Sequence, residues 1–368
     1  MSTNQKHHSE PLIHITKRDA MPMWKSLIIR AVAIVLAIIV CAVLVVVITG
    51  ANPAEFFGAI VKGSFGSARK MWMAGQEVAM LLCIALAVTP AFKMRYWNLG
   101  AEGQVLIGGL ASAACMIYAG DAMPTALLLI VMFVASMLAG AIWAVVPALF
   151  KAKWNTNESL FTLMMNYVAM QLVAFFIVLW ENPKGSGQVG VINMQSQFGW
   201  LPTIGGQKYL LNILIVAVVT VAMFIYLKYS KQGYEISVVG ESENTARYSG
   251  INVKAVIVRT VAISGAICGL AGLLLVAGTD HSISTNTAGG NGFTAIIVSW
   301  LAKFNPFIMV LASFLIIFLQ RGAGEIATSL RLNTSIADIL TGVILFFIIG
   351  CEFFINYKVN FRKRGGNA

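Results

Sequence analysis

Charged side chains are scarce in this chain of 368 residues. Asp, Glu, Lys and Arg together make up 11% of it, whereas a soluble domain carries roughly 25%. Hydrophobic residues make up 58%, and the mean hydropathy is +0.80. So few charges could not cover the surface of a soluble protein of this size. The composition disfavours a soluble enzyme, a nucleic-acid binder and a disordered scaffold, and it favours an all-α polytopic membrane protein.

Residue patterns that carry chemistry are also missing. None of the five cysteines forms a CxxC pair, and the four histidines have no metal-ligand spacing. The chain has no GxxxxGK[ST] phosphate loop and no acid–histidine pair inside an apolar run. We therefore expect no catalytic residue, no metal and no cofactor bound by this chain. If it drives transport, the energy must enter through a partner.

Apolar runs near the roughly 20 residues that a helix needs to cross a bilayer recur along the chain. The first, from Ser26 to Thr49, is longer than the core of a cleavable signal peptide, so we expect an uncleaved span. The two runs near 290–320 are short and could form broken helices or a re-entrant hairpin. We expect about ten spans, near 26–49, 76–93, 99–119, 124–150, 158–180, 209–228, 256–278, 290–302, 306–320 and 336–357.

Basic residues set the expected orientation. The net charge is +11, and the basic residues lie at the ends of apolar runs rather than in a stripe. With both termini in the cytoplasm, nineteen of the 26 Lys and Arg residues fall in inner segments and seven in outer ones, as the positive-inside rule requires. We expect a cytoplasmic tail over 1–25, a membrane domain over 26–357 and a basic cytoplasmic tail over 358–368. The membrane domain contains an extracytoplasmic loop over 181–208 and a cytoplasmic segment over 228–255.

The cytoplasmic segment has helix signals of its own. Ser242 has the pattern of an N-cap for a helix through Ser249, and Gly250 marks its end. Such a helix favours a docking surface, although a solvated connector between spans explains the same pattern.

Two glycine-rich stretches with polar residues enter spans. Residues 98–104 read NLGAEGQ, and residues 288–294 read AGGNGFT. An intramembrane Glu102 is costly unless it faces protein or water, and glycine-interrupted segments in two halves are typical of transport sites. The first stretch also reads as a helix start, with Asn98 as the cap and Glu102 near the positive end of the helix dipole.

Two further patterns concern helix faces. Thr162 and Asn166 are four residues apart and share one face of a span, where they predict either a helix contact or a cavity. Gly265, Gly269 and Gly272 form a small-residue face that is typical of close helix packing.

Several stretches together resemble one family. YWNLGAEGQ (96–104) resembles "FNIGAEGQ", TLMMNY (162–167) resembles "TIMLNY", and GGNGFTAIIVSWLAKFNP (289–306) is similar to "G.GFxAIAVALLGxxNP". VGESENTARYSGINVK (239–254) looks like "VGENPEAARYAGINV". These are signatures of the permease subunits of bacterial ATP-binding-cassette (ABC) importers, in the branch for nucleosides and simple sugars. Trp97 departs from the family's phenylalanine, and Ser242, Glu243 and Asn244 replace Asn-Pro-Glu.

The resemblance implies a set of partners and a location. It implies a multi-pass protein of the bacterial cell membrane that works with a second permease subunit, identical or related, and with cytoplasmic ATP-binding subunits that hold ATP and Mg²⁺. An extracytoplasmic solute-binding lipoprotein would deliver a small solute, and no nucleic acid is involved. It also implies a coupling helix that contacts the ATPase, made of Gly240, Glu241, Asn244, Ala246, Arg247 and Gly250.

We expect the translocation path to be lined by amide, acidic, hydroxyl and aromatic side chains, which suit a nucleoside and would also suit a sugar. These are Asn98, Glu102, Gln104, Thr162, Asn166, Asn291 and Phe293. An ion-coupled secondary transporter and a membrane-embedded enzyme or scaffold are the alternatives. The first lacks a coupling-ion site in the sequence, and the enzyme lacks a nucleophile or metal set.

Overall fold

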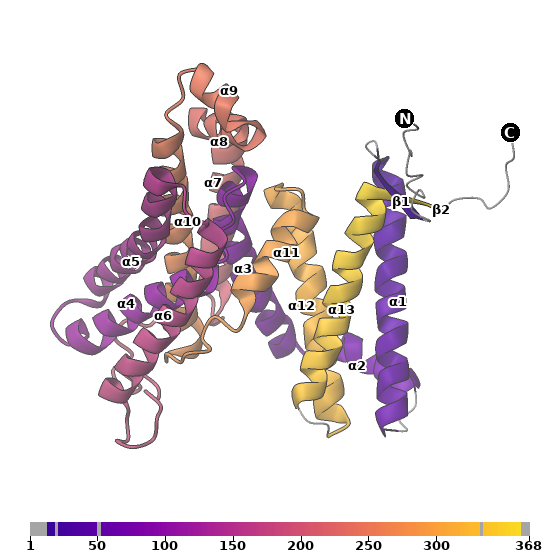
Figure 1. Cartoon of the computed structure of the whole chain (residues 1–368). Helices are drawn as coiled ribbons and strands as arrows, with labels where there is room; N and C mark the ends of the chain where they lie inside the picture. The colour runs from indigo at the N-terminus through magenta and orange to yellow at the C-terminus, as the bar shows by residue number, and fades with distance from the viewer. Residues whose placement is uncertain (1–12, 19–20, 50–52, 332–333, 362–368) are drawn as a thin grey trace, which may run out of the picture. The chain divides into compact units, whose positions relative to one another are not determined.

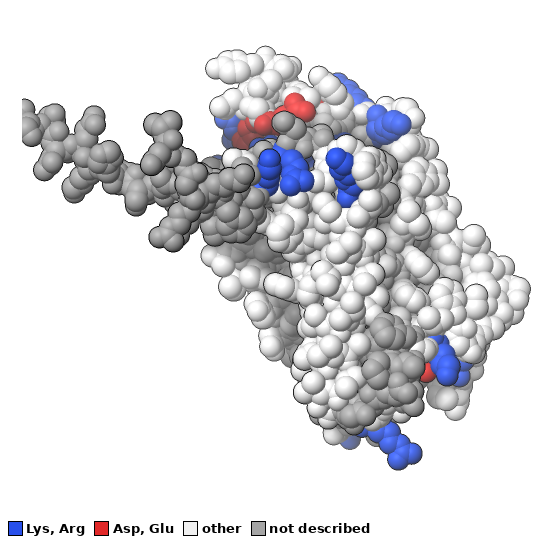
Figure 2. All heavy atoms as spheres, turned by 90° about the vertical axis from the view of Figure 1, so that its right-hand side faces the viewer, with Lys and Arg blue, Asp and Glu red and all other residues white. Residues whose placement is uncertain are grey.

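The computed structural model describes residues 13–18, 21–49, 53–331 and 334–361. The predicted tails at 1–25 and 358–368 lie partly outside these residues. The chain divides into two compact units: residues up to Gly66 together with those from Phe318 form unit 1, and Ser67–Ile317 form unit 2. Within the described residues, nine helices are long and apolar enough to cross a membrane, which confirms the all-α membrane class. On the face in Figure 2, charged side chains gather toward two ends and leave an uncharged band between them.

Unit 1 is a small helical assembly closed by a two-stranded ribbon. Helix α1 packs against α13, and Arg30 in α1 donates hydrogen bonds to Glu352 in α13 at 2.6 and 2.9 Å. Strand β1 before α1 pairs antiparallel with β2 after α13, so the two described chain ends lie on the same side, as expected. Unit 1 contains β1 (Ile13–Lys17), α1 (Met23–Thr49), α2 (Pro53–Phe65), the second part of α12 (Pro306–Ser329), α13 (Thr334–Asn356) and β2 (Tyr357–Phe361).

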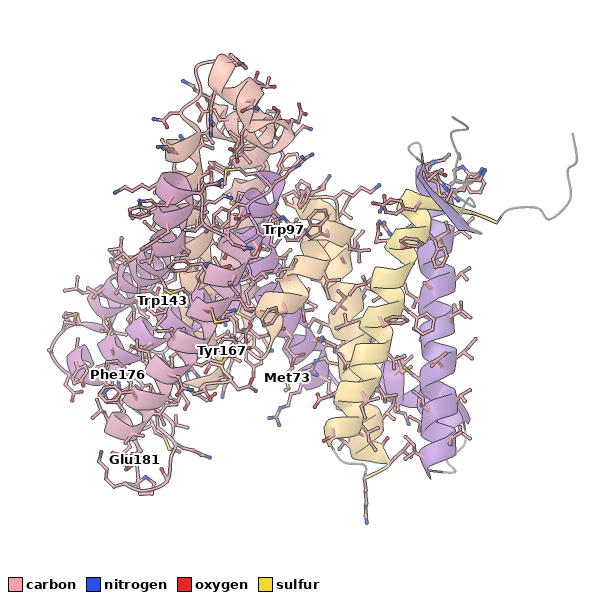
Figure 3. The ribbon with its side chains drawn as sticks, viewed as in Figure 1. Met73, Trp97, Trp143, Tyr167, Phe176 and Glu181 are labelled. Carbon is pink, nitrogen blue, oxygen red and sulfur yellow. The ribbon has the colours of Figure 1, made fainter. Side chains whose placement is uncertain are left out.

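Unit 2 contains the remaining helices (Figure 1), and the most buried span, α10, packs against α3, α4 and α5. Helices α8 and α9 lie at one end of the unit, and Glu181, which begins the long loop before α7, lies at the other (Figures 1 and 3). Its elements are α3 (Ala68–Lys93), α4 (Ala101–Ala119), α5 (Thr125–Trp154), α6 (Glu158–Trp180), α7 (Leu210–Tyr229), α8 (Lys231–Glu241), α9 (Glu243–Tyr248), α10 (Val253–Leu275), the π-helical turn Val276–Asp280, α11 (Asn291–Leu301) and the first part of α12.

The glycine face of α10 packs as predicted. A Cβ on Gly269 would lie 3.3 Å from the Cα of Gly140 in α5 and would overlap the carbonyl of Ser136, and a Cβ on Gly108 in α4 would overlap Gly269. Helices this close require glycine, because any side chain would force the backbones apart.

Two predicted span boundaries are wrong. Helix α3 begins at Ala68 rather than 76, because Ser67 caps it by accepting the Lys70 N–H at 3.2 Å. Its first turns contain polar residues, so hydropathy alone does not indicate this start. Helix α12 runs to Ser329 rather than ending at 320. Gly322, just past the predicted end, lies within the helix. A Cβ there would lie 3.1 Å from Ile60 of α2, so this glycine allows close packing. Helix α11, by contrast, is short as expected, with 11 residues.

Candidate functional site

Two interrupted helices meet inside unit 2. Helix α4 follows the irregular segment 94–100, and α11 follows the irregular segment 281–290. The carboxylate of Glu102, in the first turn of α4, accepts the N–H groups of Gly290 and Gly292 at 2.8 Å each. Gly290 has φ +74, which favours glycine. Because these N–H groups form the positive end of α11, the buried carboxylate stabilises the start of that helix.

Amide side chains hold the segment that leads into α4. The Asn98 Oδ1 accepts the Gly100 N–H and the Gln104 Nε2 at 3.1 Å each. The Asn98 Nδ2 donates to Ser264 Oγ of α10 at 3.3 Å. The predicted cap is therefore wrong: Gly100 is the N-cap of α4 and no side chain caps the helix, whereas Asn98 closes the turn before it and Gln104 completes the hydrogen bonds of Asn98.

Helix α6 supplies the other side of this junction. The Asn166 Oδ1 accepts the Gly103 N–H and the Asn166 Nδ2 donates to the Leu99 carbonyl, both at 2.8 Å. Thr162 Oγ1 accepts the Leu99 N–H at 3.1 Å and donates to the Glu158 carbonyl at 2.7 Å. The shared face of Thr162 and Asn166 is thus a helix contact in this conformation.

Five of the seven residues predicted to line a path form this junction, and we call them the polar cluster. All five are at most 4% exposed and bonded to protein, so none faces open space in this conformation. Their assignment to the path stays a prediction. The cluster comprises Asn98, Glu102, Gln104, Thr162 and Asn166.

The remaining two predicted path residues are in α11. Asn291 begins the helix and is half-buried, and its N–H bonds to the Ala288 carbonyl at 3.0 Å. Phe293 is exposed. The structure brings Asn291 next to the polar cluster through its neighbours Gly290 and Gly292.

An aromatic group that sequence reasoning missed lies beside the junction. The indoles of Trp97 and Trp300 stack with centroids 5.8 Å apart and planes 23° apart, although they are 46% and 45% exposed. Phe92 meets both rings edge-on, and Phe304 meets Trp300. Trp300 and Phe304 are four residues apart, which was the available sequence signal, but nothing in the sequence placed Trp97 beside them.

The cytoplasmic segment folds into two capped helices. Ser242 Oγ accepts the Thr245 N–H at 3.2 Å and begins α9, and Gly250, with φ +77, follows its end, as predicted. Gly240 and Glu241 belong instead to α8, which Ser230 caps by accepting the Gly233 N–H at 2.9 Å. The sequence predicts one capped helix here, and α8 is a second one that it does not predict.

These helices are anchored on the segment that leads to the polar cluster. Ala246 of α9 is fully buried in a core that includes Met94 and Tyr96, and burial, with Glu158 adding to it, raises the pKa of the Tyr96 phenol. A Cβ on Gly240 would overlap the carbonyl of Lys93. Asn244 and Arg247 face outward, and Tyr248, which sequence reasoning did not single out, is 94% exposed.

The long loop between α6 and α7 is attached to the opposite end of α10. Trp200 stacks on His281 with centroids 3.7 Å apart, and the Leu201 N–H donates to the Ala277 carbonyl at 3.0 Å. Burial, followed by the nearby Lys208, lowers the pKa of His281. Glu181 accepts the Gly185 and Gly187 N–H groups at 2.8 and 3.1 Å, which lowers the pKa of its carboxyl.

No group of three or more His, Cys, Asp or Glu side chains that could hold a metal occurs within the described ranges. The apolar helices make this a multi-pass membrane protein, in which two interrupted helices meet and a helix pair is anchored at one end. The chain belongs to the family described as "Branched-chain amino acid transport system / permease component", whose model matches residues 71–349. It is a permease component of an ABC transporter.

Curated relatives extend over nearly the whole chain. The glucose ABC transporter permease protein TsgB13 of Haloferax volcanii is 26% identical over 97% of this chain and 96% of its own length. The guanosine ABC transporter permease protein NupP of Bacillus subtilis is 27% identical over 93% of this chain and 98% of its own. A second protein of that organism, the guanosine ABC transporter permease protein NupQ, is 24% identical over 57% of this chain and 67% of its own.

Proposed function

We propose that this chain is the translocation subunit of an ATP-driven importer for a nucleoside in a bacterial plasma membrane. Two cytoplasmic ATP-binding subunits would supply the energy, with ATP and Mg²⁺ on those subunits, and an extracytoplasmic solute-binding lipoprotein would deliver the solute. The chain itself would carry out no catalytic step and bind no cofactor. The segments 228–255 and 181–208 would face the cytoplasm and the exterior, respectively.

The observation that carries the proposal is the connection between α9 and the polar cluster. Ala246 is buried with Met94 and Tyr96, and two residues further along the chain Asn98 begins the cluster. The Arg259 guanidinium of α10 donates to the Glu235 carboxylate of α8 at 2.8 Å and fixes the base of the helix pair. A push on the exposed residues of α9 would therefore reach the start of α4, and through Glu102 the start of α11.

In this proposal the polar cluster is the hinge of the path, and solute meets its residues when the junction opens. Opening must exchange internal hydrogen bonds for bonds to solute or water, because buried unpaired polar groups are costly. Phe293 and Asn291 move with α11 and would line the same opening. The exposed indoles of Trp97 and Trp300 would offer a flat surface for a base beside it.

A second permease subunit completes the proposed assembly. Bacillus subtilis has two guanosine ABC transporter permease proteins, NupP and NupQ, that are both similar to this chain. That pair favours a related second subunit over a second copy of this chain. Co-purification with a tagged copy of this chain would identify which of the two it is.

A simple sugar is the second candidate substrate, favoured by the similarity to the glucose permease protein TsgB13. The deciding experiment reconstitutes the chain with its second permease and ATP-binding subunits in vesicles and adds the binding protein. We expect ATP-dependent uptake of a labelled nucleoside that excess nucleoside, but not excess glucose, suppresses. Suppression by glucose alone would assign the sugar. Uptake by this chain alone under an ion gradient would contradict the import proposal.

A further inference from the structure

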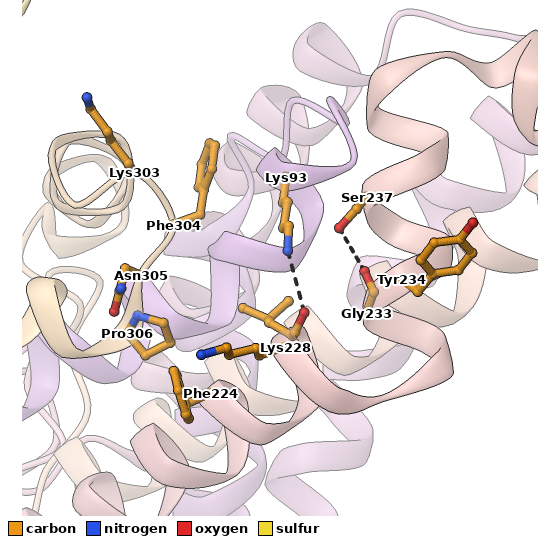
Figure 4. Close-up of a pocket in the computed structure, with 11 residues that line it drawn as sticks. Lys93, Phe224, Lys228, Gly233, Tyr234, Ser237, Lys303, Phe304, Asn305 and Pro306 are labelled. Atoms are coloured by element: carbon orange, nitrogen blue, oxygen red, sulfur yellow. Dashed lines mark hydrogen bonds between the residues drawn. The ribbon is translucent and has the colours of Figure 1, made fainter. Parts of the chain in front are cut away.

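A basic pocket lies at the end of unit 2 that carries α8. It has a volume of about 440 Å³ and is lined by 11 residues from the ends of α3 and α7, from α8 and from the turn before α12 (Figure 4). Three of the lining residues, Lys93, Lys228 and Lys303, are lysines, and none of the lining residues is Asp or Glu. The pocket therefore has a net positive charge and lies outside the polar cluster.

Two of the lysines point into the pocket. Lys93 is half-buried and its Nζ donates to the Leu227 carbonyl at 3.5 Å, and the Lys228 Nζ is 5.2 Å from the centre of the Phe224 ring. Neither contact supplies an anion. Lys303 stands at the rim and points away from the other two in Figure 4. An ammonium group retains its remaining N–H donors for a ligand, so this pair is suited to an anion.

Backbone geometry on the far wall supports an anion. Helix α12 begins at Pro306, which lines the pocket, so its positive end faces the pocket. Asn305 Oδ1 already accepts the Phe307 N–H at 3.0 Å, so the helix contributes its dipole rather than this donor. The wall thus adds a helix dipole to the charges of Lys93 and Lys228. Phosphate is the anion that such combined sites commonly bind.

The surroundings of the pocket indicate which phosphate-bearing molecule it would bind. Below the pocket, α7 exposes Val218, Val221 and Ile225 along one face, and α12 exposes Phe307, Leu311 and Phe314 along one face. The two helices approach one another at the pocket, where the Phe224 and Phe307 rings lie 4.8 Å apart. A charged pocket beside exposed apolar helix faces fits a lipid, whose phosphate would sit between the lysines while its chains cover the helices.

We propose that this pocket binds the phosphate of an anionic phospholipid in the cytoplasmic leaflet. The side of the membrane rests on the orientation given under the proposed function, and the binding itself does not. Tyr234 and Ser237 of α8 line the same pocket. Lipid occupancy would therefore steady α8, and with it the helix that receives the motion of the ATP-binding subunits.

The test titrates the purified full-length chain with phosphatidylglycerol, phosphatidylcholine or inorganic phosphate and counts bound molecules by native mass spectrometry. We expect phosphatidylglycerol to be preferred over phosphatidylcholine and to withstand excess inorganic phosphate. The double variant Lys93→Gln/Lys228→Gln should weaken phosphatidylglycerol binding about tenfold or more, because each lysine near the surface contributes on the order of tenfold or somewhat less. Size-exclusion chromatography first establishes that each variant is folded.

A matched control removes the same charge elsewhere on the same side. Lys153→Gln/Lys254→Gln should leave phosphatidylglycerol binding unchanged, since neither residue lines the pocket. Equal weakening in both double variants, or no lipid preference in the native chain, would overturn the proposal. Displacement by inorganic phosphate would assign the site to the free ion. If the Lys93→Gln/Lys228→Gln variant bound lipid normally but no longer bound the ATP-binding subunits, the pocket would be a protein-docking site instead. Every arm is independent of transport, so failure here leaves the import proposal intact.

Discussion

The carboxylate of Glu102 accepts the N–H of Gly290 at 2.8 Å, across 188 positions of sequence. A buried acidic group thereby joins the first turn of α4 to the start of α11. Helix α4 begins at the buried Ala101 and α11 at the half-buried Asn291, so their free N–H groups need partners within the protein. This one side chain supplies that partner for α11.

Replacing Glu102 with Gln should lower the stability of the purified chain by about 2 kcal/mol, because the amide offers one acceptor oxygen and no charge to two N–H groups. Thermal unfolding followed by size-exclusion chromatography measures the change. Glu181→Gln is the matched control, since Glu181 also accepts two glycine N–H groups but lies in a surface loop and is only partly buried. An equal fall in melting temperature for both variants would contradict the role of burial.

Asn166→Leu should also destabilise the chain, because it leaves the Gly103 N–H and the Leu99 carbonyl buried without partners. Each unpaired group costs about 1–3 kcal/mol. Met164→Leu, an exposed position in the same helix, should leave the melting temperature unchanged. Normal melting of the Asn166 variant together with lost uptake would favour a direct contact with solute over the helix contact.

Gly269→Ala should destabilise the chain by about 1–3 kcal/mol, because the added methyl group would overlap the Ser136 carbonyl in a packed helix contact. Gly342→Ala is the same change in α13, where no atom lies within 4 Å of the added Cβ. That control should be neutral or slightly stabilising, as alanine favours a helix over glycine. Similar melting of both variants would contradict the close approach of α10 to α5.

Acidification should loosen the attachment of the loop before α7 through His281. Its pKa in the folded chain lies below the ordinary value of about 6.5. As the pH falls, the unfolded chain therefore takes up this proton before the folded chain does. The free energy of unfolding is highest above the ordinary pKa and decreases as the pH falls through it. Between about pH 7 and pH 5 the native chain should lose more melting temperature than His281→Phe, which keeps a ring against Trp200. Equal losses of melting temperature in the native chain and in His281→Phe would show that His281 does not cause this pH dependence.

Features that depend on local residue chemistry could be predicted from the sequence. Ser242 and Gly250 mark the two ends of α9, and they could be predicted because capping depends on local residues. The spacing of the glycines in α10 likewise predicts their common face. The predicted span ends at 76 and 320 are wrong because charged residues lie just outside them, Arg69 and Lys70 before the first and Arg321 after the second, and α3 and α12 contain these residues.

Long-range pairings could not be predicted. That Glu102 would find Gly290, or Asn166 the Gly103 N–H, depends on where the interrupted helices cross, and the pairs lie far apart in the sequence. The pairing of β1 with β2 and the stack of Trp97 on Trp300 could not be predicted for the same reason, since each joins residues far apart in the sequence. The residues of the junction could therefore be predicted, but their hydrogen-bond partners could not.

The proposed mechanism requires that α9 pass the motion of the ATP-binding subunits to the junction at Glu102. Its most direct measurement is the number of solute molecules imported per ATP hydrolysed by reconstituted assemblies that carry Arg247→Glu or Tyr248→Ala, with Tyr118→Ala as the control at the far end of α4. Exposed tyrosines and arginines are the residues that most often dominate docking surfaces. Both α9 variants should fold normally yet import several-fold less solute per ATP, while the control is unchanged. An unaltered ratio in both α9 variants would contradict this mechanism.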